Sequence, residues 1–153
     1  MTHHKKVIIL PKPKEKRIPW SFYVIRYPNG TLPVDDWFLD DLSDAAQFAL
    51  RDALKDAQKI AEMTDWLCYK RRMKGELGKH KVFEIRFQCG DKREYRVLGV
   101  VGEERKQVIF LMGCYHKGGT YTPTDALETT LKRAKDLKNK KVTIHERKIR
   151  TDW

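Results

Sequence analysis

Hydrophobic and polar residues alternate along two neighbouring stretches, 82–88 and 94–101, which are separated by a short polar segment. Alternation with a period of two is typical of strands that bury one face. The two apolar faces coincide only if the loop has an odd length, most simply residues 90–92. The pattern therefore predicts an antiparallel hairpin that sets Arg86 directly opposite Arg96.

Two further stretches have the composition of strands. Residues 20–27 are rich in aromatic and β-branched side chains. Residues 107–115 are apolar at both odd and even positions, so we expect a central strand that is covered on both faces. The segment between them at 67–81 is crowded with lysine and arginine and is expected to be a loop.

Helical periodicity appears in two places. Apolar residues recur every three or four positions after residue 34, which predicts a short helix at 34–42 and a longer one reaching about residue 63, with Ser43 as a possible N-cap. Near the C-terminus, Thr122 followed by Pro123 has the character of a helix start. The order of elements predicts an α+β fold: a single antiparallel sheet of about four strands, an N-terminal helical hairpin and a C-terminal helix.

The flanking segments differ from this central region. Residues 1–17 are basic and interrupted by prolines, and we expect a mobile arm with at most a short edge strand at 7–10. The expected domain covers residues 18–141. Residues 142–153 form a tail that could add an edge strand or stay mobile. The longest run of large apolar residues, Val108–Met112, has five residues, so no membrane-spanning helix and no signal peptide is expected.

The charge and the cysteine content limit the classes of function that the sequence allows. The chain of 153 residues has 32 Lys and Arg against 21 Asp and Glu, a formal charge of +11, which favours a polyanionic partner such as nucleic acid. Its three cysteines are far apart and form no CxxC pair, which favours neither a zinc site nor a disulfide framework. We therefore expect a cytoplasmic protein without a metal or other cofactor.

The paired arginines admit two interpretations. Glu84 and Glu94 could neutralise Arg86 and Arg96, giving a ladder of ion pairs on a solvated face. Alternatively, the planar guanidinium groups could clamp a phosphate.

Several short motifs occur in a characteristic order. These are "EIR" at 84–86, "YR" at 95–96, "YHK" at 115–117 and "TPTDALETTLKRA" at 122–134. Together they resemble the phage-derived, HigB-like branch of the RelE toxin superfamily, over residues 20–138. The resemblance implies a RelE-like toxin of a toxin–antitoxin pair. Such a toxin is a metal-free mRNA endonuclease acting at the ribosome, and a cognate antitoxin, expected to be a helix-turn-helix protein, holds it inactive.

The resemblance also implies roles for individual residues. Arg86, Arg96 and Lys117 match catalytic positions that bind the phosphate and stabilise or protonate the leaving oxygen. The chain departs from the family at Gly118, where a second lysine is expected. The expected RNA-binding residues are Tyr95, Tyr115, His116, His80, Lys79, Lys81, Arg71 and Arg72, among which His116 and His80 are candidate general bases.

A second reading uses the same scaffold without catalysis. The glycine at position 118 removes one positive charge from the family motif, which favours a nucleic-acid-binding protein of phage type that does not cleave its ligand. Retention of Arg86, Arg96 and Lys117 favours the endonuclease.

Overall fold

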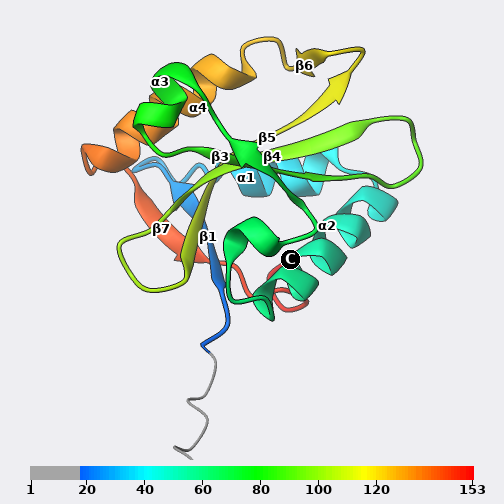
Figure 1. Ribbon diagram of the computed structural model, residues 1–153. Helices are drawn as coiled ribbons and strands as arrows, with labels where there is room; N and C mark the ends of the chain where they lie inside the picture. The colour runs from blue at the N-terminus through cyan, green and yellow to red at the C-terminus, as the bar shows by residue number, and fades with distance from the viewer. Residues whose placement is uncertain (1–17) are drawn as a thin grey trace, which may run out of the picture.

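A computed structural model describes residues 18–153, and the arm expected at 1–17 lies outside the described residues. The chain forms one mixed sheet with helices on both faces (Figure 1). The strands are β1 (Ser21–Arg26), β2 (Tyr69–Arg72), β3 (Phe83–Phe87), β4 (Glu94–Val101), β5 (Gln107–Lys117), β6 (Thr120–Thr122) and β7 (Thr143–Glu146). The helices are α1 (Pro33–Asp36), α2 (Asp44–Gln58), α3 (Gly75–Lys79) and α4 (Ala126–Lys138), with a π-helical turn η1 (Trp37–Asp41) and a 3₁₀ turn η2 (Met63–Asp65).

The predicted antiparallel sheet of about four strands is wrong. The sheet has seven strands in the order β2-β3-β4-β5-β1-β7, and β6 pairs with the end of β5. It is mixed because β1 runs parallel to β5. The extra strands are short or lack apolar alternation: β2 reads YKRR and β6 has only three residues. Local hydrophobic pattern does not reveal such strands.

The predicted hairpin is confirmed. Strands β3 and β4 pair antiparallel, with Phe87 opposite Tyr95 and Arg86 opposite Arg96. The expected central strand is also confirmed, because β5 lies between β4 and β1 and is buried along most of its length.

Each face of the sheet carries its own core. One core joins strand residues such as Ile85 and Val97 to Leu50 and Leu54 of α2. The opposite face packs under α3 and α4, through residues such as Leu77 and Ala134. Gly113 of β5 is required at its position, since a Cβ there would lie 2.0 Å from the Trp37 ring. Covering both faces explains why β5 is apolar at both odd and even positions over residues 108–115.

The helix starts differ in how well they were predicted. Ser43 caps α2 as expected, with its hydroxyl accepting a hydrogen bond from the N–H of Ala46 at 3.2 Å. The last helix begins at Ala126, not at Thr122, because Thr122 still belongs to β6 and pairs with Tyr115. Within residues 18–153, none of the helices has the length and apolar character needed to cross a bilayer.

The segment after residue 141 packs onto the rest of the fold. Strand β7 pairs antiparallel with β1 and becomes an edge of the sheet. Trp153 is buried, stacked on Phe38 at 4.6 Å between ring centroids. Asp35 fixes this segment, since it pairs with Arg147 at 2.6 Å and accepts a hydrogen bond from the Trp153 indole at 2.8 Å.

Candidate functional site

One face of the sheet carries a group of polar side chains contributed by five strands. Alternation along β3 and β4 places Arg86 and Arg96 on the same side of the hairpin. The strand pairings bring further polar residues to this side. We call this group the arginine cluster; its members are Arg71, Glu84, Arg86, Glu94, Arg96, His116 and Tyr121.

Glu84 lies at the centre of the cluster and is completely buried. Arg96, only 4% exposed, donates to it at 2.5 Å. The hydroxyl of Tyr121 donates to the other carboxylate oxygen, also at 2.5 Å. Arg71, on β2, lies with its Nε 3.9 Å from Oε1 of Glu84. A buried carboxylate needs such partners, and in turn it fixes the guanidinium of Arg96 in place.

Glu94 links the two arginines of the hairpin. One of its oxygens lies 2.9 Å from Arg96 and 3.2 Å from Arg86. Burial alone would raise the pKa of Glu94, but the positive charges of Arg96 and Arg86 outweigh it and hold the pKa below its usual value. Arg86 differs from Arg96 in access, because 49% of its side chain is exposed. Arg86 is therefore the arginine of this pair that a ligand can reach directly.

Tyr121 reaches the cluster because β5 turns sharply into β6. Gly118 and Gly119 have φ values of +62° and +84°, the sign that a tight two-residue hairpin turn requires. This turn explains the glycine where the family resemblance expected a lysine. Burial, followed by the hydrogen bond to Glu84, raises the pKa of Tyr121 to about 12. Tyr121 therefore stays protonated and keeps donating at neutral pH.

His116 stands directly opposite Tyr121, with ring centroids 4.1 Å apart in an edge-to-face arrangement. On its other side it pairs with Glu94 of β4. Among residues 18–153, its Nε2 and the Nε of Arg96 are buried nitrogens without a hydrogen-bond partner. Buried polar atoms are rarely left unpaired in this way, and such exceptions often mark functional groups.

Three predicted residues lie on the opposite face. Tyr95 is buried and stacks on Phe87 at 5.0 Å, so its ring offers no free face to a base. Tyr115 is half-buried beneath the guanidinium of Arg93, 4.6 Å from the ring centroid. Lys117 is exposed at the end of β5 and shares the parity of Tyr115. The structure thus brings His116, and not Lys117, together with the two arginines.

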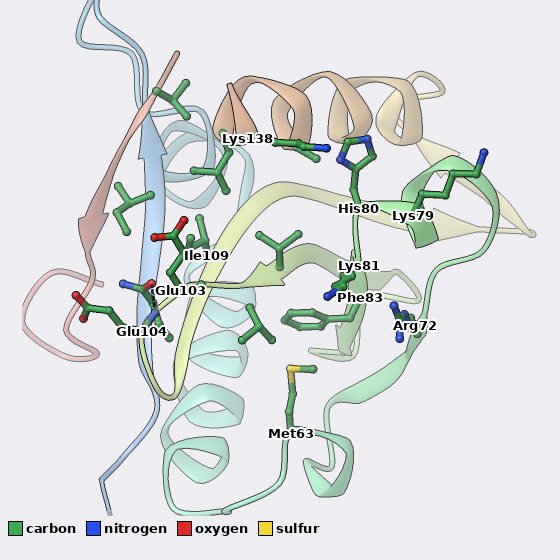
Figure 2. Close-up of a pocket in the computed structure, with 18 of the residues that line it drawn as sticks. Met63, Arg72, Lys79, His80, Lys81, Phe83, Glu103, Glu104, Ile109 and Lys138 are labelled. Carbon is green, nitrogen blue, oxygen red and sulfur yellow. Dashed lines mark hydrogen bonds between the residues drawn. The ribbon is translucent and has the colours of Figure 1, made fainter. Parts of the chain in front are cut away.

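The remaining predicted residues line a separate groove of about 950 Å³ (Figure 2). Arg72, Lys79, His80 and Lys81 lie on one side of it, and Lys138 of α4 borders it above. Arg71 and Arg72 are neighbours in sequence, yet Arg71 turns to the arginine cluster and Arg72 to the groove. The basic segment 67–81 therefore contributes side chains both to the arginine cluster and to the groove.

Tyr121 was not among the residues predicted from the sequence, and Glu84 was predicted only as a neutralising charge. The two glycines after Lys117 were the available signal, because a two-residue turn there would place Tyr121 opposite His116. Within the described part of the chain, no group of three or more His, Cys, Asp or Glu side chains is placed to hold a metal ion.

Comparison with known proteins identifies a family for this chain. The model of the family described as phage-derived protein Gp49-like (DUF891) matches residues 37–135. This range contains the whole arginine cluster. Neither the curated proteins nor the solved structures contain a match. The Gp49-like family is related to the RelE-type toxins. By this match over most of its length, the chain belongs to the phage-derived Gp49-like family.

Proposed function

We propose that this protein is the toxin of a toxin–antitoxin pair and that it cleaves mRNA at the ribosome through the arginine cluster. The observation that carries this proposal is the placement of Arg86, Arg96 and His116 on one face of the sheet, within a family related to RelE-type toxins.

The reaction that suits these residues is an internal phosphoryl transfer. The 2′-hydroxyl of a nucleotide attacks the adjacent phosphorus, the bond to the 5′-oxygen breaks, and a 2′,3′-cyclic phosphate remains. One proton leaves the 2′-oxygen and one must reach the departing 5′-oxygen. His116 is the side chain of the cluster whose imidazole can accept the proton from the 2′-oxygen and pass a proton to the 5′-oxygen. Arg86 contacts the phosphate oxygens, where negative charge develops in the transition state.

Arg96 and Lys117 have supporting roles in this proposal. Arg96 is held by Glu84 and Glu94, so it supplies a fixed positive charge beneath the phosphate. Lys117 lies on the other side of β5, at its exposed end, and is placed to contact RNA beside the cleaved bond. The partners are mRNA, the ribosome and a cognate antitoxin of helix-turn-helix type.

A second candidate is RNA binding without cleavage. The observation in its favour is the charge balance of the cluster, where two glutamates compensate most of the charge of three arginines. A compensated cluster attracts a phosphate more weakly than free arginines would.

Growth after induced expression separates the two candidates. The wild type and Arg105→Ala, a change in the exposed turn between β4 and β5, should both arrest growth, whereas Arg86→Ala should not. RNA recovered from arrested cells should carry new 2′,3′-cyclic phosphate ends. Arrest without such ends would favour binding alone, and an Arg86→Ala variant that still cleaves RNA would contradict the proposed site.

A further inference from the structure

The groove in Figure 2 lies at the end of the sheet where β4 extends beyond β3. The β3–β4 register ends with Phe83 opposite Gly99, while β4 continues to Val101. Residues 81 and 82 do not extend β3, because Lys81 has a φ of +58° and the N–H of Val82 donates to Leu77. The last residues of β4 therefore have a neighbouring strand only on the β5 side.

Backbone groups of β4 point into this gap. The N–H of Gly102 donates to the carbonyl of Gln107 at 2.8 Å, so Gly102 faces β5. Successive residues of an antiparallel strand turn their backbone groups to opposite sides. The N–H and C=O of Val101 consequently point away from β5, toward the groove. A strand edge of this kind is a template for pairing with another extended chain.

The groove is apolar on both sides of this edge. Val101 is 49% exposed, although it is a large hydrophobic residue within the sheet. Met63 and Tyr69, which pack against the core on the α2 face, line the groove, and so do Leu137 and Ile144, which pack against the core on the opposite face. An extended segment pairing with Val101 would turn alternate side chains to the two sides of the groove, one set toward Met63 and Tyr69 and the other toward the end of α4, where Leu137 lies beside Lys138.

The charge around the groove is mainly positive. Five lysines and arginines line it, together with His80, against two glutamates at the β4–β5 turn. The cationic residues are Arg72, Lys79, Lys81, Lys138 and Lys140. Lys79 is partly neutralised by Glu76 at 2.8 Å, and no ion pair within residues 18–153 joins the other four to an acidic side chain. These charges complement an acidic ligand.

From these observations we infer that the groove binds an extended segment of a partner protein, in which acidic and apolar residues alternate, as an additional strand beside β4. This inference goes beyond the proposed RNA cleavage and does not depend on it, because the groove and the arginine cluster use different side chains. The chain's own residues 1–17 are predominantly basic and do not have the complementary charge.

A labelled synthetic peptide in which valine and glutamate alternate provides the test. Its fluorescence anisotropy should rise with the concentration of the full-length protein. A peptide with lysine in place of glutamate should not bind. Lys138→Glu should weaken binding about tenfold, whereas Lys92→Glu, in the loop at the opposite end of the β3–β4 hairpin, should leave it unchanged.

The backbone contact is tested with Val101→Pro, which removes the N–H, and Val101→Ala, which keeps it. Proline should weaken binding about tenfold more than alanine does. Circular dichroism and the melting temperature show whether each variant is folded. If a variant does not fold, hydrogen exchange of the wild type replaces the comparison. Addition of the peptide should then protect the Val101 amide from exchange.

Three outcomes would overturn the inference: no binding of the acidic peptide, equal binding of the lysine peptide, or equal binding by folded Val101→Pro and Val101→Ala. Binding of single-stranded RNA that is weakened by Lys138→Glu but not by Val101→Pro would identify the groove as an RNA surface instead. The peptide assay contains no RNA, so failure here is distinguishable from failure of the proposed cleavage.

Discussion

Arg96 Nη1 lies 2.5 Å from Glu84 Oε1, and both side chains are buried within the sheet. This relationship changes what a substitution at either position is expected to do. Arg96 is not a surface cation that can be removed without cost. Removing one member of a buried pair leaves the other charge without its partner.

Glu84→Ala should lower the free energy of unfolding by about 3 kcal/mol, because the buried Arg96 would keep only Glu94 as its partner and the Tyr121 hydroxyl would lose its acceptor. Chemical denaturation measures this change. A double variant, Glu84→Leu with Arg96→Met, should cost less than the sum of the single changes, since no unpaired charge remains between them. Additive losses would show that the pair is not coupled.

Arg86→Ala should change the free energy of unfolding by less than about 0.5 kcal/mol, because the side chain is half exposed and its ion pair with Glu94 lies near solvent. The same change should abolish growth arrest. Denaturation and growth measured on one variant therefore separate stability from function. A strong loss of stability would assign Arg86 to the framework of the sheet.

Alkaline pH should destabilise the protein through three tyrosines, of which Tyr95 is buried and Tyr27 and Tyr121 are half-buried. Burial and hydrogen bonding raise the pKa values of Tyr27, Tyr95 and Tyr121 to about 12 from the ordinary 10.0. Between these values the unfolded chain loses protons that the folded chain retains, so stability is complete below pH 10 and falls as the pH rises to 12. Tyr121→Phe should reduce this fall, as seen in denaturation curves at several pH values. An unchanged pH dependence would contradict the shift.

Gly118→Lys would introduce the lysine that the resemblance predicts at this position but should lower the free energy of unfolding by about 1 kcal/mol, because a side chain at φ +62° is strained. Space is not the obstacle, since apart from residues 117–119 no heavy atom lies within 4 Å of the added Cβ. Gly118→Asn is the matched control, as asparagine tolerates this conformation better. Thermal melting compares the two, and equal stability would show that the turn does not need a positive φ.

Trp153→Ala should lower the free energy of unfolding by about 3 kcal/mol, because it empties the space beside Phe38 and releases Asp35 from one of its partners. Thr151→Ala, at a nearby exposed position, should have little effect. Chemical denaturation distinguishes them. Similar, small losses would show that the C-terminal segment contributes little to the core.

Particular residues show which features of the fold could be predicted from the sequence. Strict alternation of apolar and polar residues allowed the β3–β4 hairpin and its register to be predicted, including Arg86 opposite Arg96. The parallel pairing of β1 with β5 could not be predicted, because hydrophobic pattern carries no information on strand direction. The burial of Glu84 depends on Tyr121 and Arg96 arriving from other strands, which no local pattern reports.

The position of β1 between β5 and β7 has a consequence for the order of folding. Ser21 is paired with Gln107, and Tyr23 with Glu146, so both neighbours of β1 come from the second half of the described chain. During synthesis β1 therefore remains an unpaired, apolar strand until residues 27–106 have been made. Pairings of such sequence separation are slow to close, and strands left unpaired meanwhile are prone to aggregate. Nascent chains halted before residue 107 should consequently depend on chaperones for their solubility.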